Sequence, residues 1–145
     1  MILLIDTNVF LNVIRAEPGL ADTSEKLLSM VHRGVFTGLA ASVAIMETKW
    51  VLHERREYGK AERAVSLMED VVEFVPLDKE IAKEAMDIKI VRRLELLDSV
   101  HVSSALMRGA VLVTRDDDLR RRVEDLVPVM TPDQVLEETK DTAEE

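Results

Sequence analysis

The sequence contains no cysteine, only three histidines and no long apolar segment, and each of these absences excludes a class of function. Without cysteine the chain forms no disulfide, no thiolate zinc site and no cysteine nucleophile. His32, His53 and His101 lie far apart without the spacing of metal ligands, which argues against a histidine-rich zinc site. No segment approaches the roughly 18 apolar residues of a membrane span, and the N-terminus lacks the basic flank and apolar core of a signal peptide. We therefore expect a cytoplasmic protein without a membrane segment.

Composition and charge favour one globular domain with an acidic end. The 145 residues are 47% apolar and 32% charged, which is enough to bury a core. The net charge of −9 argues against a broad basic face for nucleic acid. Because the final EETKDTAEE is itself strongly acidic, we expect a domain over residues 1–136 and an acidic tail at 137–145. Local basic patches stay compatible with this charge, and the candidates are Arg55, Arg56 and Lys60; Arg92 and Arg93; and Arg120, Arg121 and Arg122.

Strand and helix patterns alternate along the chain, which is typical of an α/β domain with a mostly parallel sheet. Strands are predicted at residues 2–5, 35–41, 73–77, 110–114 and 126–130. Helices are predicted at 7–15, 22–33, 43–58, 60–72, 78–94, 98–108, 116–124 and from 132 onward. No repeat or low-complexity segment interrupts this alternation, so we expect no linker and no second domain.

The first strand ends abruptly at an acid, in the segment MILLIDTNVF. Asp6 follows four apolar residues and therefore lies at the carboxyl end of the predicted strand. In an open parallel sheet this end borders the crevices in which ligands bind. The alternative is that Asp6 or Thr7 only caps the following helix by accepting bonds from its free N–H groups.

A second acid is predicted on the inner face of the helix at 43–58. Val43, Trp50 and Val51 follow the three-and-four spacing of one helix face, and Glu47 falls on the same face. Burying an ionised carboxylate without a partner costs several kcal/mol, so we expect a cation to meet it. A buried salt bridge to an arginine is the structural alternative to a metal site.

Two further acids occupy comparable positions. Asp98 lies four residues before Val102 on an apolar helix face, although it is also placed to be the N-cap of that helix. Asp116 follows the predicted strand at 110–114, with Asp117 and Asp118 beside it. Acids at the start of a helix are stabilised by the helix dipole. Capping therefore accounts for one or two of these three acids, but hardly for the whole run.

We expect the four acids Asp6, Glu47, Asp98 and Asp116 to converge on one crevice. Two follow strands, and two lie near the beginnings of helices on inward faces. Like charges in such an arrangement repel unless a divalent cation neutralises them, and oxygen ligands suit Mg²⁺ or Mn²⁺ better than zinc or copper. The chemistry that this predicts is metal-assisted hydrolysis of a phosphodiester.

The segments that carry these acids resemble a known family. LLIDTNVFL, SVAIMETKWVL, LELLDSVHVSSAL and VLVTRDDDL are similar to the four acidic motifs of the PIN-domain nucleases, and VPVMTPDQVL resembles their closing strand and helix. The likeness covers residues 1–136. It implies a three-layer α/β/α sandwich with a five-stranded parallel sheet, and a Mg²⁺- or Mn²⁺-dependent endoribonuclease that cleaves single-stranded RNA. Members are frequently the toxin of a VapC-type toxin–antitoxin pair.

The resemblance also implies roles for particular residues. The catalytic, metal-binding acids that it carries over are Asp6, Glu47, Asp98 and Asp116, with Asp118 as a further acid at the metal. Asn8 and Thr114 match supporting positions that orient water or the first carboxylate. Leu119 stands where the family usually has an aromatic residue, which removes no ligand.

Partners and rival functions follow from the same comparison. The resemblance implies an antitoxin and a homodimer, for which the helices after Gly59 supply apolar surface. An RNA-processing nuclease without an antitoxin and a catalytically silent binding module remain open, although the intact acids argue against the second. A haloacid-dehalogenase-like phosphatase would need an acid where Asn8 stands, and a receiver domain would need a lysine near Arg115, so both are disfavoured.

Overall fold

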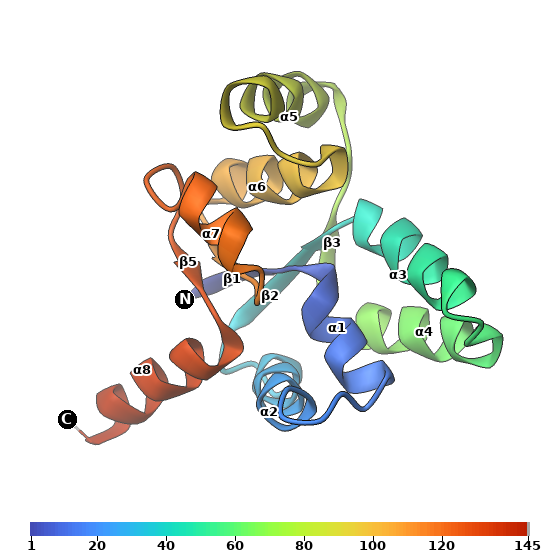
Figure 1. The fold of residues 1–145 in the computed structure, drawn as a ribbon. Helices are drawn as coiled ribbons and strands as arrows, with labels where there is room; N and C mark the ends of the chain where they lie inside the picture. Colours follow the sequence, from blue (N-terminus) through green and yellow to red (C-terminus); the bar gives the residue numbers. More distant parts are fainter. Residues whose placement is uncertain (145) are drawn as a thin grey trace.

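A sheet of five parallel strands forms the centre of the computed structural model, which describes residues 1–144 (Figure 1). The strands are β1 (Ile2–Ile5), β2 (Thr37–Ala41), β3 (Glu73–Val75), β4 (Val111–Val113) and β5 (Val129–Met130). They pair in the order β3-β2-β1-β4-β5, and every pairing is parallel. The predicted α/β/α fold class is therefore confirmed.

Helices connect the strands and cover both faces of the sheet. They are α1 (Thr7–Ile14), α2 (Ala21–His32), α3 (Val43–Glu54), α4 (Ala61–Val71), α5 (Lys79–Arg92), α6 (Leu96–Arg108), α7 (Asp117–Val123) and α8 (Pro132–Glu144). A single 3₁₀ turn, η1 (Tyr58–Lys60), precedes α4. None of the helices described in residues 1–144 combines the length and apolar character needed to cross a membrane.

Each predicted element is present, but several boundaries differ from the prediction. Strands β3 and β5 are shorter than expected because Pro76 follows one and Pro128 precedes the other, and proline has no N–H for a ladder. Helix α3 stops at Glu54 rather than near residue 58, since Arg56 has a left-handed φ of 58° that ends the helix. The expected boundary between domain and tail after residue 136 falls inside α8, so the separate acidic tail stays a prediction.

Alternate residues of the central strands face two separate apolar cores. Leu4, Leu39 and Leu112 pack with α5, α6 and α7 on one face of the sheet. Leu3, Ile5 and their neighbours pack with α1, α2, α4 and α8 on the other. Figure 1 shows the same division, with α5 and α6 above the sheet and α2 and α8 below it.

The order of the strands determines where a ligand crevice opens. From β1 the chain proceeds outward through β2 to β3, and it later returns to β4 on the opposite side of β1. The connections therefore diverge between β1 and β4, which is the switch point at which open α/β sheets bind ligands. Asp6 follows β1 and Asp116 lies just beyond β4, so both acids lie at this switch point.

A close approach of α2 to the sheet gives the first prediction. A Cβ added to Gly38 in β2 would overlap Cγ1 of Val31 in α2, and the β-branched side chain of Val31 has few other rotamers to adopt. We expect Gly38→Ala to cost about 1–3 kcal/mol of unfolding free energy, measured by denaturant unfolding. Gly59→Ala is the control, since no atom lies within 4 Å of its added Cβ. Equal stability of the two variants would contradict the close approach.

Candidate functional site

Asp6 is held by hydrogen bonds from three neighbours. Its Oδ1 accepts from the backbone N–H of Thr7 at 2.8 Å, so Asp6 does cap α1. Its Oδ2 accepts from the Thr114 hydroxyl at 2.7 Å and from Nδ2 of Asn8 at 3.1 Å. Asp6 is only 5% exposed, and these bonds fix its carboxylate at the switch point. Capping and a role in the site are therefore compatible.

Thr114 and Asn8 connect the first acid to the last. Asn8 Nδ2 also donates to the Thr114 hydroxyl at 3.2 Å, and the backbone N–H of Asp116 donates to the same hydroxyl at 3.1 Å. Both residues predicted to support the site therefore contact Asp6, and their role in orienting its carboxylate stays a prediction.

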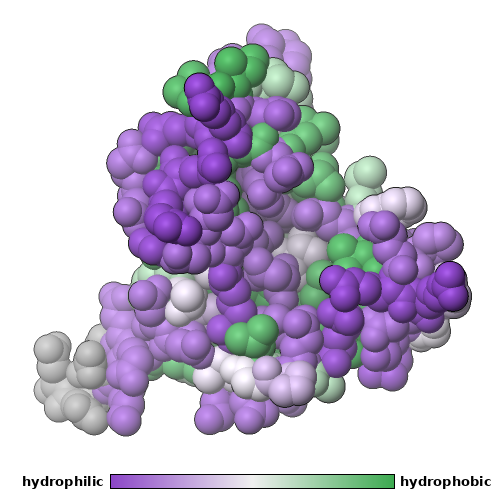
Figure 2. Space-filling model, viewed as in Figure 1, coloured by the Kyte–Doolittle hydropathy of each residue, from purple (hydrophilic) through white to green (hydrophobic). Residues whose placement is uncertain are grey.

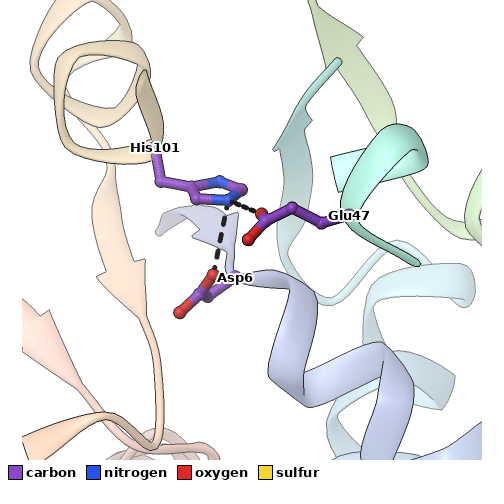
Figure 3. A group of neighbouring side chains, drawn as sticks. All are labelled: Asp6, Glu47 and His101. Carbon is purple, nitrogen blue, oxygen red and sulfur yellow. Dashed lines mark hydrogen bonds and ion pairs between the residues drawn. The ribbon is translucent and has the colours of Figure 1, made fainter. Parts of the chain in front are cut away.

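Glu47 enters the site from α3 and meets a histidine. Its Oε1 accepts from the Thr7 hydroxyl at 2.8 Å and lies 2.5 Å from Nε2 of His101. The same Nε2 lies 3.5 Å from Oδ1 of Asp6. Figure 3 shows Asp6, Glu47 and His101 reaching toward one another from the end of β1, α3 and α6. Among the described residues, no hydrogen bond or ion pair involves Oε2 of Glu47, which leaves that oxygen for a ligand.

The predicted inner face of α3 is wrong in part. Trp50 is 60% exposed, whereas Thr48 and Leu52 are completely buried. Thr48 is accommodated inside because its hydroxyl lies 3.7 Å from the Met68 sulfur. Glu47 consequently lies at the edge of the core, where its side chain keeps 23% exposure, and its partner is a histidine rather than an arginine.

Asp98 is not the N-cap of its helix. Helix α6 begins at Leu96 with Glu95 as its N-cap. Asp98 is therefore the third residue of the helix and lies in its first turn. Burial and then the charge of Asp6 raise the pKa of Asp98 to about 7, with smaller contributions in the same direction from Glu47 and Asp116 and an opposing one from His101. All four predicted acids therefore share one electrostatic environment.

Asp116 and Asp118 lie at the outer side of this environment. Asp116 is the N-cap of α7, where its Oδ1 accepts from the backbone N–H of Leu119 at 3.0 Å. Together with Asp98 they line a small polar cleft. The Asp118 side chain is 67% exposed and forms an ion pair with Arg122 at 2.9 Å, so Asp118 belongs to the rim of the site.

His101 is the member of the site that sequence reasoning missed. It is completely buried, and its Nδ1 has no hydrogen-bond partner among the described residues. Burial lowers the pKa of His101, but the charge of Asp6 and the hydrogen bond to Glu47 raise it by more, so the net shift is upward. The available signal was its position one turn after Asp98 on α6, because residues three apart share a helix face.

The contact with His101 also changes the pKa of Glu47, in the opposite direction. Burial raises the pKa of Glu47, but the hydrogen bond and the charge of His101, with the bond from Thr7, lower it by more. Glu47 and His101 therefore stabilise each other as a charged pair beside Asp6.

The residues fit a divalent cation. Ligand atoms of Asp6, Glu47 and His101 lie within 4.8 Å of one another, and Asp98 and Asp116 add charge of the same sign as the other carboxylates. Burial and then the charge of Asp6 raise the pKa of Asp98, although the charge of His101 opposes them. A hard cation with oxygen ligands relieves such repulsion, which suits Mg²⁺ or Mn²⁺.

The fold and this site define an α/β protein with an acidic centre at the switch point of a parallel sheet. Residues 3–125 match the model of the PIN domain, so the chain belongs to the PIN domain family. None of the curated proteins gives a significant match.

Solved structures support the same fold. VapBC2 from Rickettsia felis, bound to a DNA fragment from its promoter, has a TM-score of 0.73 at 15% identity, over 90% of this chain and 98% of that one. DNA-bound VapBC from Salmonella typhimurium has a TM-score of 0.71 at 16% identity, over 91% and 98% of the two chains. VapC20 from Mycobacterium tuberculosis, a toxin that cleaves the sarcin–ricin loop, has a TM-score of 0.69 at 16% identity, over 85% of this chain and 95% of that one. At these identities the likeness concerns the fold.

Asp98 gives a prediction that separates charge from structure. Its pKa is raised to about 7 in the folded chain, above about 3.9 in an unfolded one. The stabilisation by protonated Asp98 is therefore complete below about pH 4 and is lost as the pH rises through about 7. We expect Asp98→Asn to melt a few degrees above the parent at pH 8 in EDTA, and close to the parent at pH 5.

The control for this experiment is Asp118→Asn, which removes an exposed charge at the rim. Its effect is expected to be small and similar at both pH values. If Asp98→Asn lowers the melting temperature equally at pH 5 and pH 8, Asp98 has a structural role and the proposed acidic cluster is wrong.

Proposed function

We propose that the chain is a Mg²⁺- or Mn²⁺-dependent endoribonuclease that cleaves phosphodiester bonds in single-stranded RNA. The observation that carries this proposal is the convergence of carboxylates at the switch point. Ligand atoms of Asp6, Glu47 and His101 lie within 4.8 Å of one another, and Asp98 and Asp116 line one cleft. Membership of the PIN domain family supports it. So does the structural similarity to VapC20, a toxin that cleaves the sarcin–ricin loop.

The metal ligands in this proposal are Asp6, Glu47, Asp98 and Asp116, with Asp118 at the rim. A divalent cation bound there would stabilise negative charge on the phosphate and lower the pKa of a water molecule. The chain itself supplies orientation. Thr114 and Asn8 fix one oxygen of Asp6. Thr7 and His101 fix Oε1 of Glu47, and no residue that the structure describes bonds to its Oε2. Rigid carboxylates lose little freedom when they bind a cation, which favours tight and specific binding.

We further propose that the chain is the toxin of a type II toxin–antitoxin pair and acts in the cytoplasm. Several structures of similar fold are described as VapBC complexes, and one as a toxin–antitoxin complex from Klebsiella pneumoniae. An antitoxin with a basic segment would complement the acidic site, since an arginine or lysine among the carboxylates replaces the metal.

A homodimer remains part of the proposal. Of the helices after Gly59, α5 presents the exposed apolar side chains Met86, Ile90 and Val91. Figure 2 shows apolar residues gathered over α5 at the top of the view. Such a patch is suited to pairing with a second copy.

The nuclease proposal is tested by cleavage of single-stranded RNA. We expect cleavage with Mg²⁺ or Mn²⁺ and none with EDTA, and a loss of about 100-fold or more in Glu47→Gln and Asp98→Asn. Mg²⁺ at about 100 times its dissociation constant should stabilise the parent by about 2.7 kcal/mol, and these variants by much less. Asp117→Asn is the control, because Asp117 pairs with Arg120 outside the cluster. Full activity after removal of all metal would refute the proposal.

The toxin proposal is tested separately with the product of the neighbouring gene. We expect the two proteins to co-purify after co-expression and the nuclease rate to fall in the complex, because a basic side chain occupies the acidic site. A complex that cleaves RNA at the rate of the free chain would contradict inhibition through this site.

A further inference from the structure

A groove with exposed aromatic rings runs along α3 immediately beside the acidic site. Its lining residues are Met46, Lys49, Trp50 and His53 from α3 and Leu97 from α6, and we call these five residues the α3 shelf. The four residues from α3 are spaced three and four apart, so they share one face of the helix. Met46 is 66% exposed and Trp50 is 60% exposed. This face of α3 is therefore unusually apolar for an exposed surface.

The rings on this face form a row. Trp50 and His53 are stacked, with centroids 5.9 Å apart and an interplanar angle of 24°. His53 then meets Tyr58 edge-on, with centroids 5.4 Å apart. Trp50 and Tyr58 are the only tryptophan and the only tyrosine of the chain, and both are exposed. Exposed aromatic rings in series are a common platform for the bases of single-stranded nucleic acids.

The two helices that form the shelf, α3 and α6, also carry Glu47 and Asp98. Met46 precedes Glu47 and Leu97 precedes Asp98, so two lining residues are sequence neighbours of two site residues. Trp50 lies three residues after Glu47, which corresponds to a rise of about 4.5 Å along a helix. A nucleotide adjacent to a phosphate at the acids therefore lies within reach of Trp50.

The charges at this end of α3 favour RNA as the occupant. Among the described residues, Lys49, Arg55 and Arg56 take part in no ion pair. Six other arginines pair with acids, namely Arg15, Arg92, Arg115, Arg120, Arg121 and Arg122. Among the described residues Arg33, Arg63, Arg93 and Arg108 also form no ion pair, so what distinguishes Lys49, Arg55 and Arg56 is their position on or just after the helix that carries the shelf. Unpaired cations beside aromatic rings match a phosphate backbone with its bases. A symmetric dimer across the same face would instead bring these cations toward their own copies.

We propose that the α3 shelf binds a nucleotide of the single-stranded RNA substrate next to the cleaved bond. One base stacks on Trp50, and Lys49 pairs with a backbone phosphate. This assignment rests on the proposed nuclease function and adds to it the surface that positions the substrate. Trp50 acts on binding, so its loss should raise KM far more than it lowers kcat.

The test uses Trp50 as its own reporter, because it is the only tryptophan. In the Asp98→Asn background with Mg²⁺, a short single-stranded RNA is expected to quench tryptophan fluorescence saturably. Trp50→Ala in this background should weaken RNA binding, measured by anisotropy of a labelled RNA, by about 5- to 100-fold, as expected for one stacked base. Trp50→Phe keeps a ring and should retain most of the affinity. Met107→Ala, which changes an exposed apolar residue near the end of α6, is the matched control and should bind within about twofold of the parent.

The outcomes separate the shelf from the nuclease proposal. If the parent cleaves RNA while RNA leaves the fluorescence unchanged and Trp50→Ala binds normally, the shelf is wrong and the nuclease stands. If RNA quenches Trp50 but the parent cleaves no RNA with any divalent metal, the nuclease proposal fails, and the shelf stands only as a surface that binds single-stranded RNA. If sedimentation shows that Trp50→Ala converts a dimer to a monomer without changing RNA affinity, a second copy covers the shelf and the assignment is overturned.

Discussion

Repulsion among carboxylates at the carboxyl edge of the sheet is the constraint on which the site depends. Asp6 is nearly inaccessible to water, yet its charge raises the pKa of Asp98 and of His101. The fold tolerates this buried charge because Thr7, Asn8 and Thr114 donate hydrogen bonds to it. The same donors join β1, α1 and β4, so the bonds that solvate the carboxylate also fix the junction at which the chain changes direction across the sheet. Stability and site geometry therefore share one set of contacts.

The charges of Asp6 and Glu47 contribute to the raised pKa values of both His101 and Asp98. The histidine gains affinity for a proton because it lies beside Asp6 and Glu47, and Asp98 gains affinity for a proton because it is largely buried and lies near the same acids. In the metal-free chain, protons thus supply part of the positive charge that a divalent cation would supply. A cation that enters the site competes with those protons, so its affinity should increase with pH as Asp98 ionises.

Sequence reasoning succeeded where local pattern and tertiary environment agree. Alternating apolar runs and helical spacings predicted five strands, eight helices and the parallel sheet, because burial on both faces makes parallel strands continuously apolar. Asp6 and Asp116 were placed at strand ends for the same reason. The expectation for Glu47 named the right helix for a partly wrong reason, since Trp50 is outside and Thr48 inside. An apolar side chain does not by itself identify the buried face of a helix, because apolar residues such as Trp50 can also lie on an exposed face.

The unpredicted parts of the site depend on contacts between distant segments. His101 meets Glu47, a residue 54 positions earlier, and no local pattern contains that pairing. Likewise, the availability of Lys49, Arg55 and Arg56 depends on which cations the fold has already paired with acids. The net charge of −9 averages over these differences. Several arginines pair with acids, whereas within the described part of the chain Arg55 and Arg56 at the end of α3 form no ion pair. For an acidic protein proposed to act on RNA, the distribution of unpaired cations around the catalytic acids is therefore more informative than the sum.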